Sequence, residues 1–397
     1  MQKLLLKTAS AALLLTIGAS AYGNPVANLV QSTIETALAK FRVDNNIDPG
    51  VQLTDSKTAA ADVQSLALLP KEPQAIMRVI LETFAADSPR RLNTLSPVEA
   101  RLEPDIGQAA AKIADSLAIG PDRIGGVINF DNMQVASGTL KSRVYVPVGL
   151  GPFPLILYIH GGGWVVGNLD TGDASARALC IGTNAVVVAI DYRKAPEFKF
   201  PAAYEDCLGA YQWMLTNAEK IRGDRTKVAV AGEGAGGTMA VAVSMMARER
   251  GLPMPRHQVL IYPIADLTNF NKSSYLEYAE ARPLSREEMM WFSQELLNRP
   301  EDARDPRISP ALAPTDKLRG LPPTTIINAQ IDPLKSDGDR LTVALTVARV
   351  KVNHAVYEGV THGFFGLGSL LAQSQYATDL AAADINASFG RTMPGAL

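Results

Sequence analysis

Short, continuous apolar runs alternate with helical patterns from about residue 124 onward. Two of these runs are Leu155–Ile159 and Ala185–Ile190. A strand that is buried on both faces has this composition, because neither face meets water. Strands that alternate with helices predict a parallel sheet with helices on both sides. This pattern limits the chain to the α/β class.

We predict eight strands in this part of the chain. They are Gly126–Val135, Lys141–Pro147, Leu155–His160, Ala185–Tyr192, Lys227–Ala231, Gln258–Tyr262, Thr324–Ala329 and Ala355–Glu358. The stretch at about 265–310 interrupts the alternation with aromatic residues and a predicted helix over Arg286–Asn298. An insertion near the carboxyl edge of a sheet is a natural lid over a binding site. A peripheral helix with buried aromatic side chains explains the same residues equally well.

The region before the sheet has a mostly helical pattern. Apolar residues recur at helical spacing over Val26–Phe41 and Ala75–Phe84, as in amphipathic helices. We therefore predict a helical N-terminal region at 22–120, which serves either as a cap or only as packing. Residues 121–397 then form one domain that includes the lid-like insertion.

The first 21 residues have the features of a secretory signal peptide. Lys3 and Lys7 give a positive start, Ala11–Ile17 is apolar, and the small residues Ala19 and Ala21 flank Ser20, as at a cleavage site. We expect cleavage after Ala21 and an exported protein, either periplasmic or secreted. A buried N-terminal helix is the alternative. No later run is long and apolar enough to span a membrane.

The net charge and the spacing of the histidines and cysteines argue against several classes of function. The formal net charge is −2, so nothing predicts the basic surface that nucleic acids require. The chain has four histidines, which are scattered, and two cysteines, Cys180 and Cys207, without zinc-site spacing, so no metal is expected. An exported protein permits a disulfide, but we predict two buried free thiols on opposite faces of the sheet.

A glycine-rich stretch follows the predicted strand Leu155–His160. It reads HGGGW over His160–Trp164. Glycines let the backbone turn sharply and bring N–H groups together without a Cβ in the way. Converging N–H groups at a strand end stabilise an oxyanion. The dinucleotide fingerprint has a different glycine spacing, so we predict an oxyanion-binding loop.

A second glycine-rich turn, Gly232–Gly237, reads GEGAGG. It lies between the predicted strand Lys227–Ala231 and a helical pattern over Met239–Arg250. The order strand, turn, helix is that of the nucleophile elbow G-x-S-x-G, whose serine takes a strained backbone angle. Gly234 occupies the serine position. Glycine fits such a backbone but has no side chain for attack.

Residues near this turn supply an oxyanion donor but no replacement nucleophile. The N–H of Ala235 would join the oxyanion donors. Ser175, Ser244 and Ser336 lie outside the turn, so none is expected to replace the missing hydroxyl.

An acid and a base follow two later predicted strands. Asp332 comes after Thr324–Ala329, and His362 comes after Ala355–Glu358 beside a glycine. The order elbow, acid, histidine is the order of the α/β-hydrolase triad. The histidines at 257 and 354 stand at the start of predicted strands, and we interpret them as structural.

The chain resembles the hormone-sensitive-lipase-like carboxylesterases (bacterial family IV), an α/β-hydrolase family. The matching residues are His160–Trp164, Asp191–Glu197 (DYRKAPE), Phe200–Ala203 (FPAA), Gly232–Gly237, Asp332–Leu334 (DPL) and His362–Phe364 (HGF). The resemblance covers roughly residues 120–390. It implies a mostly parallel eight-stranded sheet flanked by helices, no cofactor, and small-molecule esters with short to medium acyl chains as substrates.

The same resemblance implies roles for individual residues. Asp332 and His362 would be the triad acid and base, and Gly161, Gly162 and Ala235 the oxyanion donors. The chain departs from the family at Gly234, where the family has serine, and at Glu233, where it commonly has aspartate. Residues 22–95 are a longer helical segment than the family would lead us to expect.

Loss of the hydroxyl removes the acyl-enzyme route, so we expect the chain to bind esters far better than it cleaves them. Three interpretations stay open: a carboxylesterase whose serine was replaced deliberately, a natural non-catalytic relative that binds small esters or acids, and a lyase that uses His362 as its base. The oligomeric state and the natural substrate do not follow from the sequence.

Overall fold

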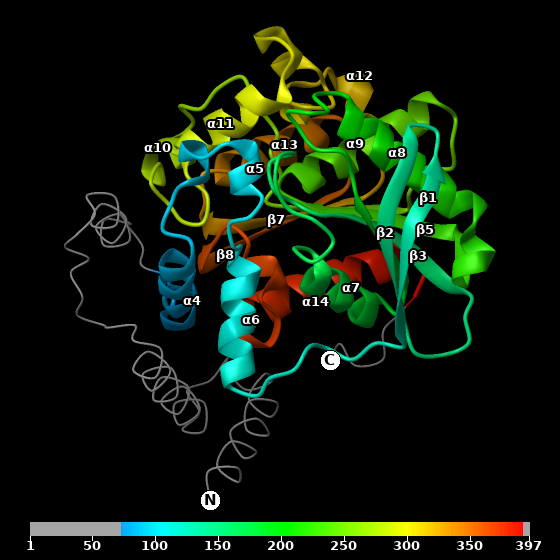
Figure 1. Cartoon of the computed structure of the whole chain (residues 1–397). Coiled ribbons are helices and arrows are strands. Elements are labelled where there is room, and N and C mark those ends of the chain that lie inside the picture. Colours follow the sequence, from blue (N-terminus) through cyan, green and yellow to red (C-terminus); the bar gives the residue numbers. More distant parts are fainter. Residues whose placement is uncertain (1–72, 392–397) are drawn as a thin grey trace, which may run out of the picture.

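The computed structural model describes residues 73–391 (Figure 1). Its strands are β1 Gly126–Val135, β2 Gly138–Val146, β3 Phe153–Ile159, β4 Val186–Asp191, β5 Gly223–Glu233, β6 His257–Ile261, β7 Thr324–Ile331 and β8 Val352–Thr361. They form one eight-stranded sheet in the order β1-β2-β4-β3-β5-β6-β7-β8. Strand β2 is antiparallel to β1 and β4, and the other neighbours are parallel. The predicted mostly parallel sheet is confirmed.

Helices cover both faces of this sheet. They include α7 Asp173–Thr183, α8 Ala202–Thr216, α9 Ala235–Glu249, α12 Thr315–Leu318, α13 Lys335–Val347 and α14 Ala372–Ser388. Figure 1 shows α7 and α14 on one side of the strands and α8, α9 and α13 on the other. Two apolar cores result, one on each face. Because β3 and β4 are buried on both faces, their sequences carry almost no polar residue.

The two cysteines lie in different cores. Cys180 belongs to α7 and Cys207 to α8, on opposite faces of the sheet, and both are buried and free. The prediction of two separate buried thiols is confirmed. Burial raises the pKa of the Cys180 thiol to about 12, so this group stays protonated at neutral pH.

The N-terminal region is helical where the structure describes it, with α4 Ala75–Asp87, α5 Pro97–Ala100 and α6 Ile106–Ser116. The predicted signal peptide and the predicted helix over Val26–Phe41 lie outside the described residues. Within residues 73–391, no helix combines the length and the apolar character that crossing a bilayer requires.

The insertion packs against the N-terminal region. It contains α10 Ser273–Glu277 and α11 Arg286–Leu296. The Arg91 guanidinium donates to the carbonyl of Ala281 at 2.9 Å, and the Leu92 N–H donates to the Glu288 carboxylate at 3.1 Å. Two segments that are about two hundred residues apart in sequence therefore meet above the carboxyl edge of the sheet (Figure 1).

The parallel strands β5, β6, β7 and β8 end at the same edge of the sheet. Ligands in open α/β sheets bind outside the carboxyl ends of the strands. The residues that follow β5, β7 and β8 include Gly234, Asp332 and His362. The topology thus gathers the predicted site at one edge.

Acid should destabilise the protein through the histidine at the start of β6. His257 lies between the hydroxyls of Ser388 and Thr325, each 2.9 Å from a ring nitrogen, and burial lowers its pKa from 6.5 to about 4. The unfolded chain therefore binds this proton first, so stability is full above about pH 6.5 and is lost as pH falls toward 4. The expected loss is about 3 kcal/mol at the lower end.

Urea unfolding of the unchanged chain and of His257→Gln between pH 7 and pH 4 measures this contribution. We expect a flatter pH dependence in the variant. Since burial also lowers the pKa of His160 and His354, only the difference between the two curves reports His257. Parallel curves would contradict the prediction.

Candidate active site

Gly234 forms the turn between β5 and α9. Strand β5 ends at Glu233 and α9 begins at Ala235. The Gly234 backbone has φ +53° and ψ −117°, outside the regions that residues with a Cβ prefer. Its N–H donates to the Ile261 carbonyl at 2.9 Å, and its carbonyl accepts from the Thr238 N–H at 3.2 Å. The turn has the backbone of a nucleophile elbow without a side chain at its tip.

Asp332 and His362 pair at the ends of β7 and β8. His362 Nδ1 lies 2.8 Å from Asp332 Oδ2. Asp332 is fully buried, and its Oδ1 accepts from the Leu334 N–H at 2.8 Å, which fixes the carboxylate. An ionised carboxylate can only accept, so Nδ1 carries the hydrogen. In this tautomer of the imidazole, Nε2 is the acceptor nitrogen.

This acceptor nitrogen faces the turn tip. A Cβ built on Gly234 would lie 3.6 Å from both Nε2 and Cε1 of His362. A serine hydroxyl, one bond further out, would therefore be within hydrogen-bonding reach of Nε2. The structure brings Gly234, Asp332 and His362 together.

The glycine loop after β3 carries available amides. Gly162 has φ +103°, and its carbonyl accepts from the N–H groups of Val165 and Val166 at 3.0 and 2.9 Å, which closes a tight turn. In residues 73–391, neither the Gly161 N–H nor the Gly162 N–H donates to a backbone acceptor. Ala235 is the first residue of α9, where an N–H has no intrahelical partner. These amides can receive a ligand oxygen.

Two side chains that sequence reasoning did not single out hold this loop. The Tyr192 hydroxyl donates to the carbonyls of His160 and Gly161 at 3.2 and 3.1 Å, and its ring stacks on His160. Arg101, from the N-terminal region, donates to the Val165 carbonyl at 2.8 Å. Tyr192 lies in the DYRKAPE stretch that resembles the family, so the sequence contained a motif that points to it. No sequence motif marks Arg101.

Glu233, directly before the turn, is held by two tyrosines. The hydroxyls of Tyr158 and Tyr262 donate to its two carboxylate oxygens. Burial, and then the Glu233 carboxylate, raise the pKa of both tyrosines well above the ordinary value, so both stay protonated donors. The Tyr262 ring lies 4.4 Å from the His362 ring, centre to centre. Glu233 therefore fixes the positions of Tyr158 and Tyr262 beside the turn.

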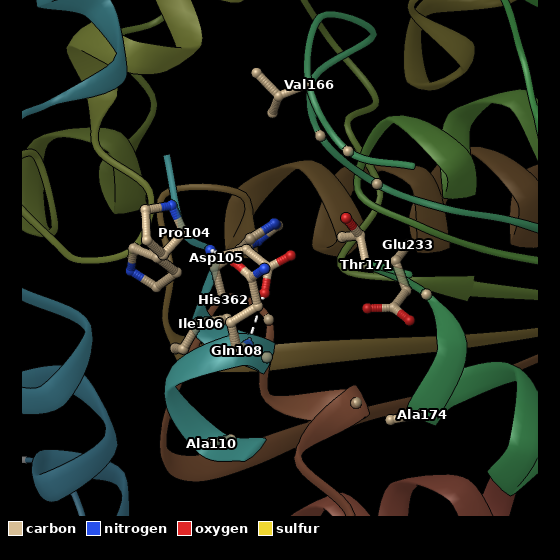
Figure 2. A pocket seen from close by; sticks show the side chains of 18 of the residues that line it. Pro104, Asp105, Ile106, Gln108, Ala110, Val166, Thr171, Ala174, Glu233 and His362 are labelled. Carbon is tan, nitrogen blue, oxygen red and sulfur yellow. Dashed lines mark hydrogen bonds between the residues drawn. The ribbon is translucent and has the colours of Figure 1, made fainter. Parts of the chain in front are cut away.

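A pocket of about 910 Å³ opens onto these groups. The lining residues include Gly161, Gly162, Gly234, Ala235 and His362, together with residues of α6 and α11. Figure 2 shows Asp105, Ile106 and Gln108, at the start of α6, beside His362. A Cβ on Gly163 would lie 2.3 Å from the Phe292 ring of α11. Both the N-terminal region and the insertion therefore form pocket walls.

The remaining serine candidates do not reach the elbow. Ser244 is buried in α9 and donates to the Ala240 carbonyl at 3.3 Å. Ser336 bonds to the Ser274 hydroxyl at 2.8 Å. Ser175 lines the pocket, but it lies on α7, beside Tyr158. Among the residues that the structure describes, no cluster of His, Cys, Asp or Glu could hold a metal ion.

A side chain at position 234 should be tolerated. In Gly234→Ala the only contact that the new Cβ makes beyond its own turn is with His362, at an ordinary distance of 3.6 Å, so the cost is backbone strain of about 1–3 kcal/mol. In Gly236→Ala the Cβ would stand 2.0 Å from the Ile159 carbonyl oxygen, which requires the backbone to move. Urea unfolding should therefore show a clearly larger loss for Gly236→Ala. Equal losses would contradict the described turn.

The chain is similar in sequence to known ester hydrolases. Residues 156–366 match the family described as the alpha/beta hydrolase fold. The carboxylic ester hydrolase LipN of Mycobacterium tuberculosis is 38% identical over 61% of this chain and 65% of its own length. Ethyl acetate hydrolase of Pseudomonas putida is 35% identical over 59% of this chain and 74% of its own. The match thus spans slightly less than two thirds of LipN.

Solved structures agree in fold. The esterase of Pyrobaculum calidifontis is 35% identical, with a TM-score of 0.68 over 74% of this chain and 94% of that one. The ester-hydrolase EH1AB1 from the Lake Arreo metagenome is 34% identical, with a TM-score of 0.71 over 80% of this chain and 99% of that one. With the matched region running from Ile156 in β3 to beyond His362, the chain belongs to the α/β-hydrolase family, among the hormone-sensitive-lipase-like carboxylesterases.

Proposed function

We propose that the chain is a carboxylesterase in every part of its site except the nucleophile. It binds esters with small to medium acyl groups and hydrolyses them only slowly, because Gly234 replaces the catalytic serine. The observation that carries the proposal is the position of His362. Its Nε2 faces the place where a side chain at 234 would begin, 3.6 Å away, while Asp332 holds its Nδ1 at 2.8 Å.

The geometry supports acyl transfer once a hydroxyl is present at position 234. His362 Nε2 would take the hydroxyl proton while the oxygen attacks the ester carbonyl, and Asp332 would stabilise the resulting imidazolium. The amides of Gly161, Gly162 and Ala235 would then receive the developing oxyanion. His362 would return the proton to the leaving alcohol, and water would release the acyl group by the reverse steps.

The unchanged chain keeps the binding and oxyanion parts of this machinery. In serine hydrolases these parts alone leave about 10³–10⁴-fold acceleration over water. Residual hydrolysis would use a water molecule that His362 activates directly. We therefore propose slow turnover without an acyl-enzyme.

Small esters are the substrate class that the pocket and the relatives support. The pocket brings the apolar side chains of Ile264, Met289 and Phe292 to the same space as the oxyanion amides. Among the relatives, one is an ethyl acetate hydrolase. We extend its substrate class to this chain as part of the proposal.

The test compares the unchanged chain with Gly234→Ser on p-nitrophenyl butyrate. A pre-steady-state burst of p-nitrophenol in the variant supports the proposal. A variant that binds butyrate esters tightly yet shows neither burst nor turnover would instead identify a binding protein. Conversion of a non-ester acid by the unchanged chain would identify a lyase.

A further inference from the structure

Gly234 leaves the Cε1–Nε2 edge of the His362 ring open to the pocket. Beyond the turn's own neighbouring residues, a Cβ at position 234 would have only Cε1 and Nε2 of His362 within 4 Å, each at 3.6 Å. Because Asp332 engages Nδ1, Nε2 is the free nitrogen. The site therefore has an acceptor nitrogen and open space where relatives with a serine would have a covalently attached hydroxyl.

The distances beside Gly234 allow the oxygen of a separate molecule to contact both His362 Nε2 and the Gly234 Cα. The oxygen must lie about 2.8 Å from Nε2 for a hydrogen bond and about 3.3 Å from the Gly234 Cα for a close C–H contact. The Cα is at most about 5.1 Å from Nε2, since the Cβ position is 3.6 Å from the ring and one bond of about 1.5 Å from the Cα. The two required distances together exceed this separation, so one oxygen can satisfy both.

The walls of the same pocket favour an oxygen that carries a small alkyl group. Ile264, Met289 and Phe292 line the pocket together with Gly234 and His362. Apolar walls gain by contact with an alkyl group and gain nothing from water.

We propose that this opening is a binding site for a small primary alcohol, with methanol the smallest, and that the chain transfers acyl groups to it directly from an ester. The proposal rests on the proposed function, because the ester must bind in the same pocket. The alcohol is then a second substrate, and its oxygen acts as the nucleophile in place of the missing serine hydroxyl.

The chemistry balances without a covalent enzyme intermediate. His362 Nε2 takes the alcohol proton as the alcohol oxygen bonds to the ester carbonyl carbon, and the oxyanion faces the amides of Gly161, Gly162 and Ala235. The intermediate collapses by breaking the bond to the original alkoxy group, which receives the proton from His362. One ester and one alcohol are consumed, and a new ester and a new alcohol are formed.

The experiment follows methyl butyrate by gas chromatography when the full chain acts on p-nitrophenyl butyrate in increasing methanol. We expect its rate of formation to rise with both substrates in the pattern of sequential kinetics. In His362→Gln it should fall by about 10²–10⁴-fold, the usual contribution of a general base. In Gly234→Ala it should also fall, because a methyl group then occupies the space 3.6 Å from Nε2.

Equal methyl butyrate formation by the unchanged chain and by either variant, with near-UV circular dichroism showing all three folded, would overturn the proposal. The Gly234→Ser variant distinguishes a failure of the alcohol site from a failure of the proposed esterase function. If it hydrolyses the ester while the unchanged chain ignores methanol, only the alcohol site is wrong. If it is also silent, the proposed function itself fails.

Discussion

The Gly234→Ser variant hydrolyses p-nitrophenyl butyrate faster than the unchanged chain by about 10³-fold to 10⁶-fold. The upper figure is the cost of removing the nucleophile from subtilisin, taken by analogy. The large effect is expected because only the hydroxyl is absent: the new Cβ would lie 3.6 Å from His362 Nε2, and the His362–Asp332 pair is already formed at 2.8 Å. The measurement is kcat/KM for both proteins.

Gly234→Ala is the matched control for this gain. It places the same Cβ on the same strained backbone, with φ +53°, but adds no hydroxyl. It should be no faster than the unchanged chain. If alanine and serine raised the rate equally, the gain would come from stiffening the turn and not from a nucleophile.

Asp332→Asn, made in the Gly234→Ser background, lowers kcat by about 10⁴-fold, as the equivalent change does in a serine protease. The reason is the tautomer of His362. Asp332 accepts from both the Leu334 N–H and His362 Nδ1, and an amide in this buried place would offer an N–H to the ring. The imidazole would then carry its proton on Nε2 and could not take the proton of the attacking hydroxyl.

Asp339→Asn in the same background is the control. Asp339 lies on α13 and pairs with the Lys335 ammonium at 2.8 Å, and its side chain is 39% exposed. It lies outside the pocket lining, so kcat should stay within a few-fold. A similar loss in both variants would indicate general destabilisation of α13 and not a role for Asp332 in the reaction.

The sheet could be predicted from the sequence because burial on two faces leaves a local signal. Strand β3 and all of β4 except Asp191 are unbroken apolar runs. The edge strand β8 was predicted over four residues, Ala355–Glu358, whereas the structure extends it to Val352–Thr361. Over most of its length exposed positions are interspersed with half-buried ones, and only Val360 and Thr361 are buried, so it lacks the apolar run of a central strand. Strand β5 likewise begins earlier than predicted, at Gly223, within a polar stretch.

The chemical groups of the site could be predicted because each stands in a short motif beside a strand end. The groups that hold them could not. Arg101 reaches the Val165 carbonyl across 64 positions of sequence, and Ile106 of α6 packs on Gly363 beside the histidine. Such contacts depend on how the N-terminal region folds back over the sheet edge. No local pattern in residues 97–116 encodes that placement.

The most direct test of the account is covalent labelling at position 234. The unchanged chain and the Gly234→Ser variant are treated with a p-nitrophenyl alkylphosphonate, and intact-mass and peptide mass spectrometry locate the adduct. We expect one phosphonyl group on the variant, at residue 234, and none at that residue in the unchanged chain. A hydrolytically active variant labelled at a different residue, or labelled nowhere, would contradict the claim that this chain is an esterase lacking only its nucleophile.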